Sequence, residues 1–204
     1  MLYKDNPQSR RVAIDLPQGS VILQTCCPTR LVESLETECG LRAFARQPEC
    51  EHRRLLDIAR RPENSLALAY TPAGVIIGQI TMAPADGWWP RMSRAYEVAL
   101  EISPTWRKQG VAHRLLAMVL EEEHIEDLII LGMGLSSHWD TERVGLSPAR
   151  YRDMLIHFLA YHGFIDYLTS EPNIRMEPYN VLLARIGIRV SLETTLQFYH
   201  DLVS

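Results

Sequence analysis

The sequence lacks any apolar run long enough to cross a membrane, and its first residues, MLYKDNPQSRR, lack the apolar core of a secretory signal. It also lacks an excess of basic charge. Its net charge is −4 at pH 7, whereas general nucleic-acid binding requires a basic surface. These absences argue against an integral membrane protein and a nucleic-acid-binding protein. We therefore expect a cytoplasmic protein with neither a membrane nor a nucleic acid as partner.

Cysteine is scarce, and the four cysteines all lie in the first quarter of the chain, at Cys26, Cys27, Cys39 and Cys50. The adjacent pair does not match the two-residue spacing of a zinc knuckle. A cytosolic protein keeps its thiols reduced. The pattern therefore favours reduced, mostly buried thiols over a metal site or a disulfide framework, and we expect no bound metal.

What is present suits one globular domain spanning residues 1–204, because 47% of the residues are hydrophobic and 23% are charged. Hydrophobic periodicity and turn residues predict its elements along the chain. They are a hairpin at 11–25, helices at 29–39 and 49–61, strands at 65–70 and 75–83, a strand, loop and helix at 96–123, a strand at 127–135, a helix at 148–162, strands at 164–169 and 179–186, and a helix at about 190–203. This order predicts an α/β fold with helices on both faces of a sheet.

Two adjacent tryptophans, Trp88 and Trp89, lie in the loop PADGWWPRMSR. Exposed together, they would form an apolar binding patch. Folded down on the sheet, they would instead anchor the loop. The residues alone do not separate these two interpretations.

The segment from Tyr96 to Glu123 reads as a strand, a tight basic loop and an amphipathic helix. Its loop, Arg107-Lys108-Gln109-Gly110-Val111-Ala112, combines two cations with a glycine immediately before the helix. Backbone N–H groups at a helix N-terminus, flanked by cations, bind phosphate oxygens. The segment therefore predicts a diphosphate-binding loop. The alternative is a basic turn before a helix, because a single glycine-containing loop is a weak signal.

Arg107, Gly110 and Ala112, placed after the strand VALEIS, resemble motif A of the GNAT superfamily of acyl-CoA N-acyltransferases. Lys108 stands where many members carry glycine. The resemblance implies the GNAT fold, a mixed, mostly antiparallel sheet with splayed central strands, and acetyl-CoA as acetyl donor. It also implies a set of coenzyme contacts: Leu100, Glu101 and Ile102 to the pantetheine arm, and Arg107, Lys108, Gln109, Gly110, Val111 and Ala112 to the pyrophosphate.

The segments SHWDTERVGLSPARYRDML and NVLLARIG resemble the family of acetoin utilization proteins of AcuA type. This resemblance covers most of the chain, most strongly residues 95–187. It implies a protein lysine acetyltransferase whose acceptor is acetyl-CoA synthetase, which acetylation inactivates. It also makes the hairpin at 11–25 and the helix at about 190–203 extensions typical of the family. The sequence does not decide whether the chain is a monomer or a homodimer.

Acetyl transfer to a lysine requires a neutral amine, and the ε-amine has a pKa of about 10.4 in solution. Glu97 and Glu101 are the candidates for the general base, because they lie four residues apart and point to the same face of one strand. Glu101, nearer the loop, is preferred, although Glu97 resembles the position used by some GNAT protein acetyltransferases. The alternative is a structural ion pair with Arg94 or His124.

A tyrosine that protonates the leaving thiolate lies, in many GNAT enzymes, four residues before a Gly-Phe pair. Before Gly163-Phe164 that position is Leu159, so this chain departs from the pattern. Tyr161 is a weak candidate for the general acid, with a role in the core as the alternative. Tyr151 fits the AcuA-type segment and is equally consistent with packing.

His138, Trp139 and Asp140 follow the strand at 127–135, where a substrate loop would lie. A His-Asp pair two residues apart suits orientation of an amine or a proton relay. The alternative is a polar loop anchored by Trp139. We interpret the three residues as lying on the substrate side of the site.

Two other functions remain in competition with a protein lysine acetyltransferase. One is a GNAT enzyme that acetylates a small amine, such as a polyamine or an amino sugar. The other is a non-catalytic module that binds and senses an acyl-CoA.

Overall fold

The computed structural model describes residues 9–45, 47–89, 92 and 94–203. The chain divides into two compact units, each described by itself below. Unit 1 consists of Met1–Ala83 and Ala99–Glu122, and unit 2 consists of Pro84–Val98 and Glu123–Ser204. Strand β6 (Ala95–Ile102) begins in unit 2 and ends in unit 1.

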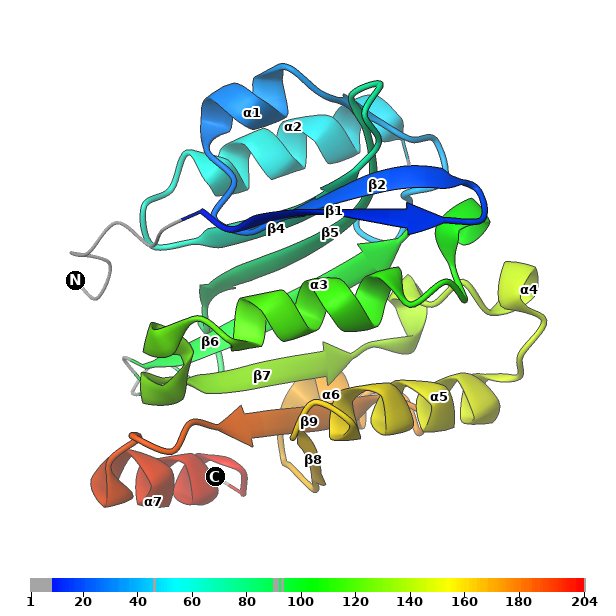
Figure 1. The fold of residues 1–204 in the computed structure, drawn as a ribbon. Coiled ribbons are helices and arrows are strands. Elements are labelled where there is room, and N and C mark those ends of the chain that lie inside the picture. The colour runs from blue at the N-terminus through cyan, green and yellow to red at the C-terminus, as the bar shows by residue number, and fades with distance from the viewer. Residues whose placement is uncertain (1–8, 46, 90–91, 93, 204) are drawn as a thin grey trace. The chain divides into compact units, whose positions relative to one another are not determined.

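The strands of unit 1 follow one another as antiparallel neighbours in the order β1, β2, β4 and β5, shown from blue to teal in Figure 1. Their bounds are β1 Arg11–Leu16, β2 Gly19–Gln24, β4 Ser65–Tyr70 and β5 Val75–Pro84. The hairpin predicted at 11–25 is thus confirmed, with Leu16 paired to Gly19 across its turn. A short strand, β3 (Glu36–Thr37), runs parallel to the start of β5.

The helices of unit 1 cover both faces of β4. They are α1 Thr29–Glu33, α2 Pro48–Ala59 and α3 Val111–Leu120. Every residue of β4 is buried, which matches its contacts with both α2 and α3. Leu66, Leu68 and Tyr70 of β4 join the core that includes Leu55 of α2. Alternate side chains of a strand point to opposite faces, so α2 covers one face and α3 the other.

The helix predicted at 29–39 is wrong beyond its first turn. The structure ends α1 at Glu33 and places β3 in the remainder. Backbone pairing explains the difference, because the amide of Glu36 donates to the carbonyl of Gly74 and the amide of Glu38 to that of Ile76. A strand partner that lies forty residues away along the chain is invisible to local helical periodicity.

The strands of unit 2 follow the order β6, β7, β9 and β8. Their bounds, besides β6, are β7 Ile129–Gly134, β8 Ile165–Tyr167 and β9 Val181–Ile186. β6 and β7 are parallel, whereas β9 is antiparallel to both β7 and β8. Most ladders between described residues are therefore antiparallel, as expected for the predicted mixed sheet.

The helices of unit 2 confirm the predicted helical segments at 148–162 and about 190–203. They are α4 Thr141–Val144, α5 Pro148–Ala160, α6 Pro172–Arg175 and α7 Leu192–Asp201. Ser147 and Ser191 cap α5 and α7, because their side chains accept hydrogen bonds from the amides of Arg150 and Thr194. Gly163 follows α5 with a φ of 83°, a left-handed conformation that suits glycine.

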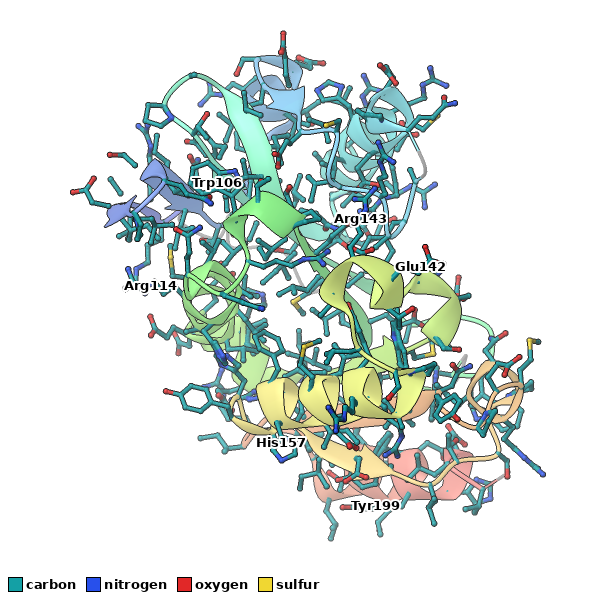
Figure 2. The ribbon with its side chains drawn as sticks, turned by 90° about the vertical axis from the view of Figure 1, so that its right-hand side faces the viewer. Trp106, Arg114, Glu142, Arg143, His157 and Tyr199 are labelled. Atoms are coloured by element: carbon teal, nitrogen blue, oxygen red, sulfur yellow. The ribbon has the colours of Figure 1, made fainter. Side chains whose placement is uncertain are left out.

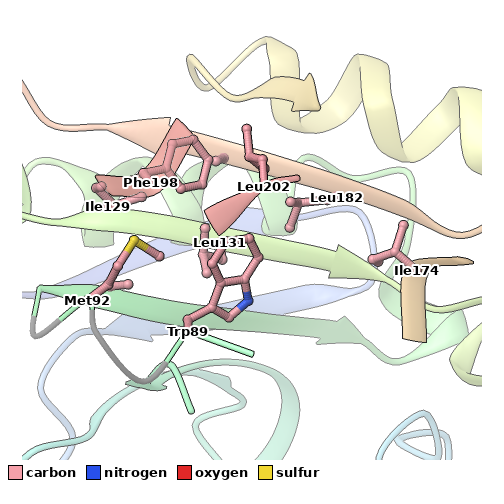
Figure 3. Close-up of a cluster of buried hydrophobic side chains, with 10 residues drawn as sticks. Trp89, Met92, Ile129, Leu131, Ile174, Leu182, Phe198 and Leu202 are labelled. Carbon is pink, nitrogen blue, oxygen red and sulfur yellow. The ribbon is translucent and has the colours of Figure 1, made fainter. Parts of the chain in front are cut away.

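A cluster of buried apolar side chains joins β7, β9 and α7 in unit 2, as Figure 3 shows. Trp89 is almost fully buried there and stacks on Phe198 with ring centroids 5.9 Å apart. Trp88 packs against the same cluster, and its indole N–H donates to the carbonyl of Asp201 over 2.8 Å. Both tryptophans are thus folded down, which settles the open question in favour of an anchored loop.

The cysteines only partly follow the prediction of buried thiols. All four are free; Cys27 is buried and Cys26 half-buried, but Cys39 and Cys50 are exposed. Among the residues that the structure describes, no helix has the length and apolar character needed to span a bilayer.

Candidate active site

The basic loop of unit 1 has an unusual backbone. Lys108 has a φ of 62° and Gly110 a φ of 77°, so left-handed positions alternate along it. Only glycine adopts this conformation readily. A Cβ added at Gly110 would meet nothing closer than the guanidinium Nε of Arg114, at 3.9 Å. Glycine is therefore required here by its backbone conformation, and the space beside it is open to a ligand.

Helix α3 begins directly after Gly110 without a side-chain cap and without an acidic residue in its first turn. The first amides of an α-helix have no acceptor within the helix. No acidic side chain of this first turn therefore neutralises the positive end of the helix dipole. Such a helix start binds anions.

Three cationic residues lie in or next to this loop, and their environments differ. Arg107 is half-buried, and its Nε donates to the carbonyl of Ile102 over 2.9 Å, which ties the loop to the end of β6. Lys108 is exposed. Arg114, also exposed, lies one turn into α3 beside Gly110 (Figure 2). Arg114 was missed by the sequence analysis, although its spacing of four residues from Gly110 places it on the same side of the helix.

Glu101 of β6 is only 6% exposed and is held by the backbone of unit 1. Its Oε1 accepts hydrogen bonds from the amides of Arg42 and Ala43, at 2.7 and 2.9 Å. Burial raises the pKa of Glu101, although these two amides and Arg107 oppose the rise. Its Oε2 is buried and has no partner among the described residues. Glu101 thus anchors a loop, and its carboxylate is already engaged.

Glu97 of β6 has a different environment, in unit 2. It is half-buried, and its side chain makes no hydrogen bond to any described residue. Burial, together with the negative charges of Asp86 and Glu171, raises the pKa of Glu97 to about 7. A carboxyl group with a pKa near neutrality suits proton transfer. The structure therefore favours Glu97 over Glu101, the reverse of the sequence-based preference.

Among the described residues, Arg94 forms no ion pair with either of these glutamates, contrary to one of the alternatives raised for them. Its guanidinium lies 3.9 Å from the carboxylate of Asp127 instead. Glu171, whose charge acts on Glu97, is buried and caps α6, accepting a hydrogen bond of 2.7 Å from the amide of Ile174. Of the two acidic neighbours of Glu97, only Asp86 is therefore exposed.

The parallel ladder between β6 and β7 is short. It comprises three residue pairs and ends at Glu97 and Leu131. β7 continues beyond that point in register with β9, as far as the pair of Gly134 and Val181. The backbone pairing between β6 and β7 therefore ends at Glu97, the candidate base.

Tyr161 lies at the C-terminal end of α5 with 78% of its surface exposed, and its ring contacts that of His162. So exposed a phenol is poorly placed to act in a water-excluded site. Leu159 occupies the position of the family's tyrosine, and its Cδ1 lies 3.2 Å from where a Cβ on Gly132 of β7 would be. The position usually held by the acid is thus apolar.

The segment around His138 is a folded loop of unit 2. A 3-10 turn, η3 (Ser136–His138), is tied down by the amide of Ser136, which donates to the side chain of Asn180 over 2.7 Å. Trp139 stacks on Tyr151 with centroids 5.1 Å apart and an interplanar angle of 16°. This stack gives both aromatic residues a packing role. Asp140 lies 3.9 Å from the guanidinium of Arg143.

Within the described residues, no group of three or more histidine, cysteine, aspartate or glutamate side chains is arranged to hold a metal ion. The chemistry that the described residues offer is anion binding at the start of α3 and proton transfer at Glu97.

Comparison with known proteins gives concordant results. Residues 30–131 match the acetyltransferase (GNAT) family. The chain is 30% identical to the acetoin utilization protein AcuA of Bacillus subtilis, over 89% of this chain and 90% of that protein. The AcuA protein of Bacillus licheniformis is also 30% identical, over 89% and 88% of the two chains. The crystal structure of an acetoin utilization protein from Exiguobacterium sibiricum superposes with a TM-score of 0.92 at 26% identity, covering 98% of this chain and 96% of the other.

Proposed function

Because this chain belongs to the GNAT acetyltransferase family, and is therefore an acetyl-CoA-dependent N-acetyltransferase, we propose that it acetylates the ε-amine of a protein lysine. We further propose that the acceptor protein is acetyl-CoA synthetase, which acetylation inactivates. The similarity to AcuA proteins over 89% of the chain supports this proposal. The observation that carries the chemistry is the half-buried Glu97, with its pKa of about 7.

The donor binds, in this proposal, at the basic loop. The pyrophosphate of acetyl-CoA accepts hydrogen bonds from the loop amides and the start of α3, where Gly110 leaves open space. Lys108 and Arg114 add charge-assisted contacts. Arg107 contributes by holding the loop to Ile102. Leu100, Glu101 and Ile102 line the pantetheine arm with their backbone groups.

Glu97 acts as the general base. With a pKa of about 7, it is substantially ionised at neutral pH and accepts a proton from the lysine ammonium, directly or through one water. The neutral amine then attacks the thioester carbonyl. The C–N bond forms, the nitrogen releases its second proton to solvent, the C–S bond breaks in the collapse of the tetrahedral intermediate, and the thiolate of coenzyme A leaves with the electron pair.

We assign no side chain to protonation of the thiolate. Tyr161 is too exposed and Leu159 is apolar. A thiol has a pKa of about 8.5, so the thiolate is a competent leaving group without a general acid and takes its proton from solvent. His138, Trp139 and Asp140 then serve the acceptor side by shaping the loop that Trp139 and Tyr151 hold together.

The test is incubation of purified acetyl-CoA synthetase with this protein and acetyl-CoA, followed by intact-mass analysis and assay of synthetase activity. We expect a mass increase of one acetyl group, with loss of synthetase activity in proportion. The Glu97→Gln variant should leave the mass unchanged. An unmodified synthetase, alongside demonstrated coenzyme binding, would overturn the acceptor assignment.

A second candidate is acetylation of a small polyamine. It is favoured by the acidic environment of Glu97, whose neighbours are Asp86 and Glu171. Because Glu171 is buried in a helix cap, only Asp86 is exposed to attract a polycation. Assay of spermidine and an amino sugar in parallel with the synthetase separates the candidates. Coenzyme binding with no transfer to any amine would instead support a sensor.

A further inference from the structure

Helix α7 of unit 2 has two apolar faces. The inner face carries Phe198 and Leu202 into the core cluster. The outer face carries three large apolar side chains that are substantially exposed, Leu192 at 73%, Leu196 at 58% and Tyr199 at 45%, and Val203, at 72%, follows two residues after the helix ends. We call these four residues the outer stripe. In Figure 2, Tyr199 lies on the outer side of α7, away from α5. A surface helix of a monomer usually has one apolar face.

The apolar surface extends beyond the helix. Leu168, 94% exposed, follows β8 two residues before Ser170, whose amide donates to the carbonyl of Leu202 over 2.7 Å. Tyr167 of β8 contacts Tyr199, with ring centroids 6.1 Å apart. The segment after β8 and the end of α7 therefore lie side by side within unit 2, and Leu168 continues the outer stripe.

We propose that two copies of this chain associate through the outer stripe, with their α7 helices packed antiparallel about a two-fold axis. The stripe residues are spaced by four, three and four positions, which is the spacing of a coiled-coil seam. An antiparallel arrangement places Leu192 against Val203 of the partner subunit, and Leu196 against Tyr199 of the partner subunit. Such an interface is self-complementary, as a two-fold dimer requires.

Charge on the rim of the stripe fits the same arrangement. Glu193, at the start of α7, and His200, in its last turn, are both exposed and lie seven residues apart on one side of the stripe. Antiparallel packing brings Glu193 next to His200 of the partner subunit, where an imidazole N–H can donate to the carboxylate.

The available area suits a dimer. The outer stripe and Leu168 expose five large apolar side chains, and contiguous apolar patches of several hundred Å² often mark an interaction site. A stable interface buries roughly 800 Å² per partner, and polar rim atoms supply the remainder. The stripe thus provides an apolar centre with a polar border.

The test is sedimentation equilibrium of the full chain. We expect a monomer–dimer equilibrium, and a dissociation constant about a hundredfold higher for L196E, because the new carboxylate is buried in an apolar seam. M176E is the matched control: Met176 is 72% exposed but lies at the end of α6, outside the stripe. It should leave the dissociation constant unchanged. Circular dichroism of each variant checks that the chain folds.

A mixing experiment tests the antiparallel register. In a mixture of L196E and Y199R chains, the new carboxylate of one copy faces the new guanidinium of the other. We therefore expect each variant alone to be monomeric and the mixture to form a heterodimer. A wild-type monomer at the highest soluble concentration would overturn the proposal. So would a dimer that L196E leaves intact, or a monomer whose stripe binds the acceptor protein instead.

Discussion

The Oε1 atom of Glu101 accepts a hydrogen bond of 2.7 Å from the backbone amide of Arg42. A residue on β6 thereby fixes the loop that leads into α2, within unit 1. This bond favours Glu97 over Glu101 as the candidate base on the strand that they share. The carboxylate of Glu101 is bound to backbone amides, whereas the carboxylate of Glu97 makes no hydrogen bond to a described residue, and burial raises its pKa to about 7.

Glu101→Ala should destabilise the protein by about 2 kcal/mol, because the amides of Arg42 and Ala43 lose a buried acceptor. Glu101→Gln keeps an acceptor oxygen and should fold normally. Urea denaturation of both variants measures the difference. If Glu101→Ala is as stable as the wild type, the anchoring role is wrong.

The stability difference should also depend on pH. Burial raises the pKa of Glu101 above its unfolded value, so the folded state binds the proton more tightly. Its contribution to stability is therefore fully present below the unfolded pKa and is lost as pH rises through the folded pKa. We expect Glu101→Gln to gain in melting temperature relative to the wild type on going from acid to neutral pH. Thermal melts across that range measure this trend.

Glu97→Gln should lower kcat at neutral pH by about a hundredfold or more, the range typical of losing a general base, with coenzyme affinity unchanged. Turnover and coenzyme titration measure the two quantities separately. The control is Glu63→Gln, which removes an exposed carboxylate from the loop before β4. Equal activity of the Glu97 variant and the wild type would remove Glu97 from the mechanism.

The pH profile offers an independent check on Glu97. The ionised carboxylate is the active form, so kcat/KM should rise with pH along a limb whose apparent pKa is about 7. The negative charge of Asp86 helps to raise this pKa. Asp86→Asn should therefore move the limb to lower pH. A limb that stays in place in this variant would indicate that another group titrates.

Gly110→Ala should weaken coenzyme binding, because a left-handed conformation costs a residue other than glycine about 1–2 kcal/mol and the loop would relax away from it. Calorimetric titration with coenzyme A measures the loss. Gly87→Ala is the matched control, since Gly87 has a φ of 59° and nothing lies within 4 Å of its added Cβ. The control should lose similar stability but bind coenzyme normally.

Arg114→Ala should raise the dissociation constant for coenzyme A about tenfold, as expected for one charge-assisted phosphate contact of about 1.4 kcal/mol. The effect should shrink as salt increases. Arg150→Ala, at an exposed arginine of α5, controls for the change in net charge. An unchanged affinity in the Arg114 variant would exclude it from the coenzyme site.

Local patterns predicted the elements that depend on near neighbours in the chain. The hairpin at 11–25, the turn between β4 and β5, and helices α5 and α7 all follow from turn residues, caps and apolar spacing. The helix predicted at 29–39 was wrong because β3 forms through a parallel pairing with β5. Non-local pairing overrides a local preference without leaving a local signal.

Some features of the candidate site likewise follow from near neighbours in the chain, and others depend on the tertiary structure. The residue types and spacing of Arg107, Gly110 and Ala112 by themselves predicted a loop before a helix and its proposed role in binding phosphate, because a helix start and two cations are adjacent in the chain. Only the tertiary structure distinguished the environments of Glu97 and Glu101, and only it placed Trp89 in the core. The burial of a carboxylate, and the amides and charges around it, come from segments distant in sequence. The sequence holds the acids, but the pKa of each is a property of the folded protein.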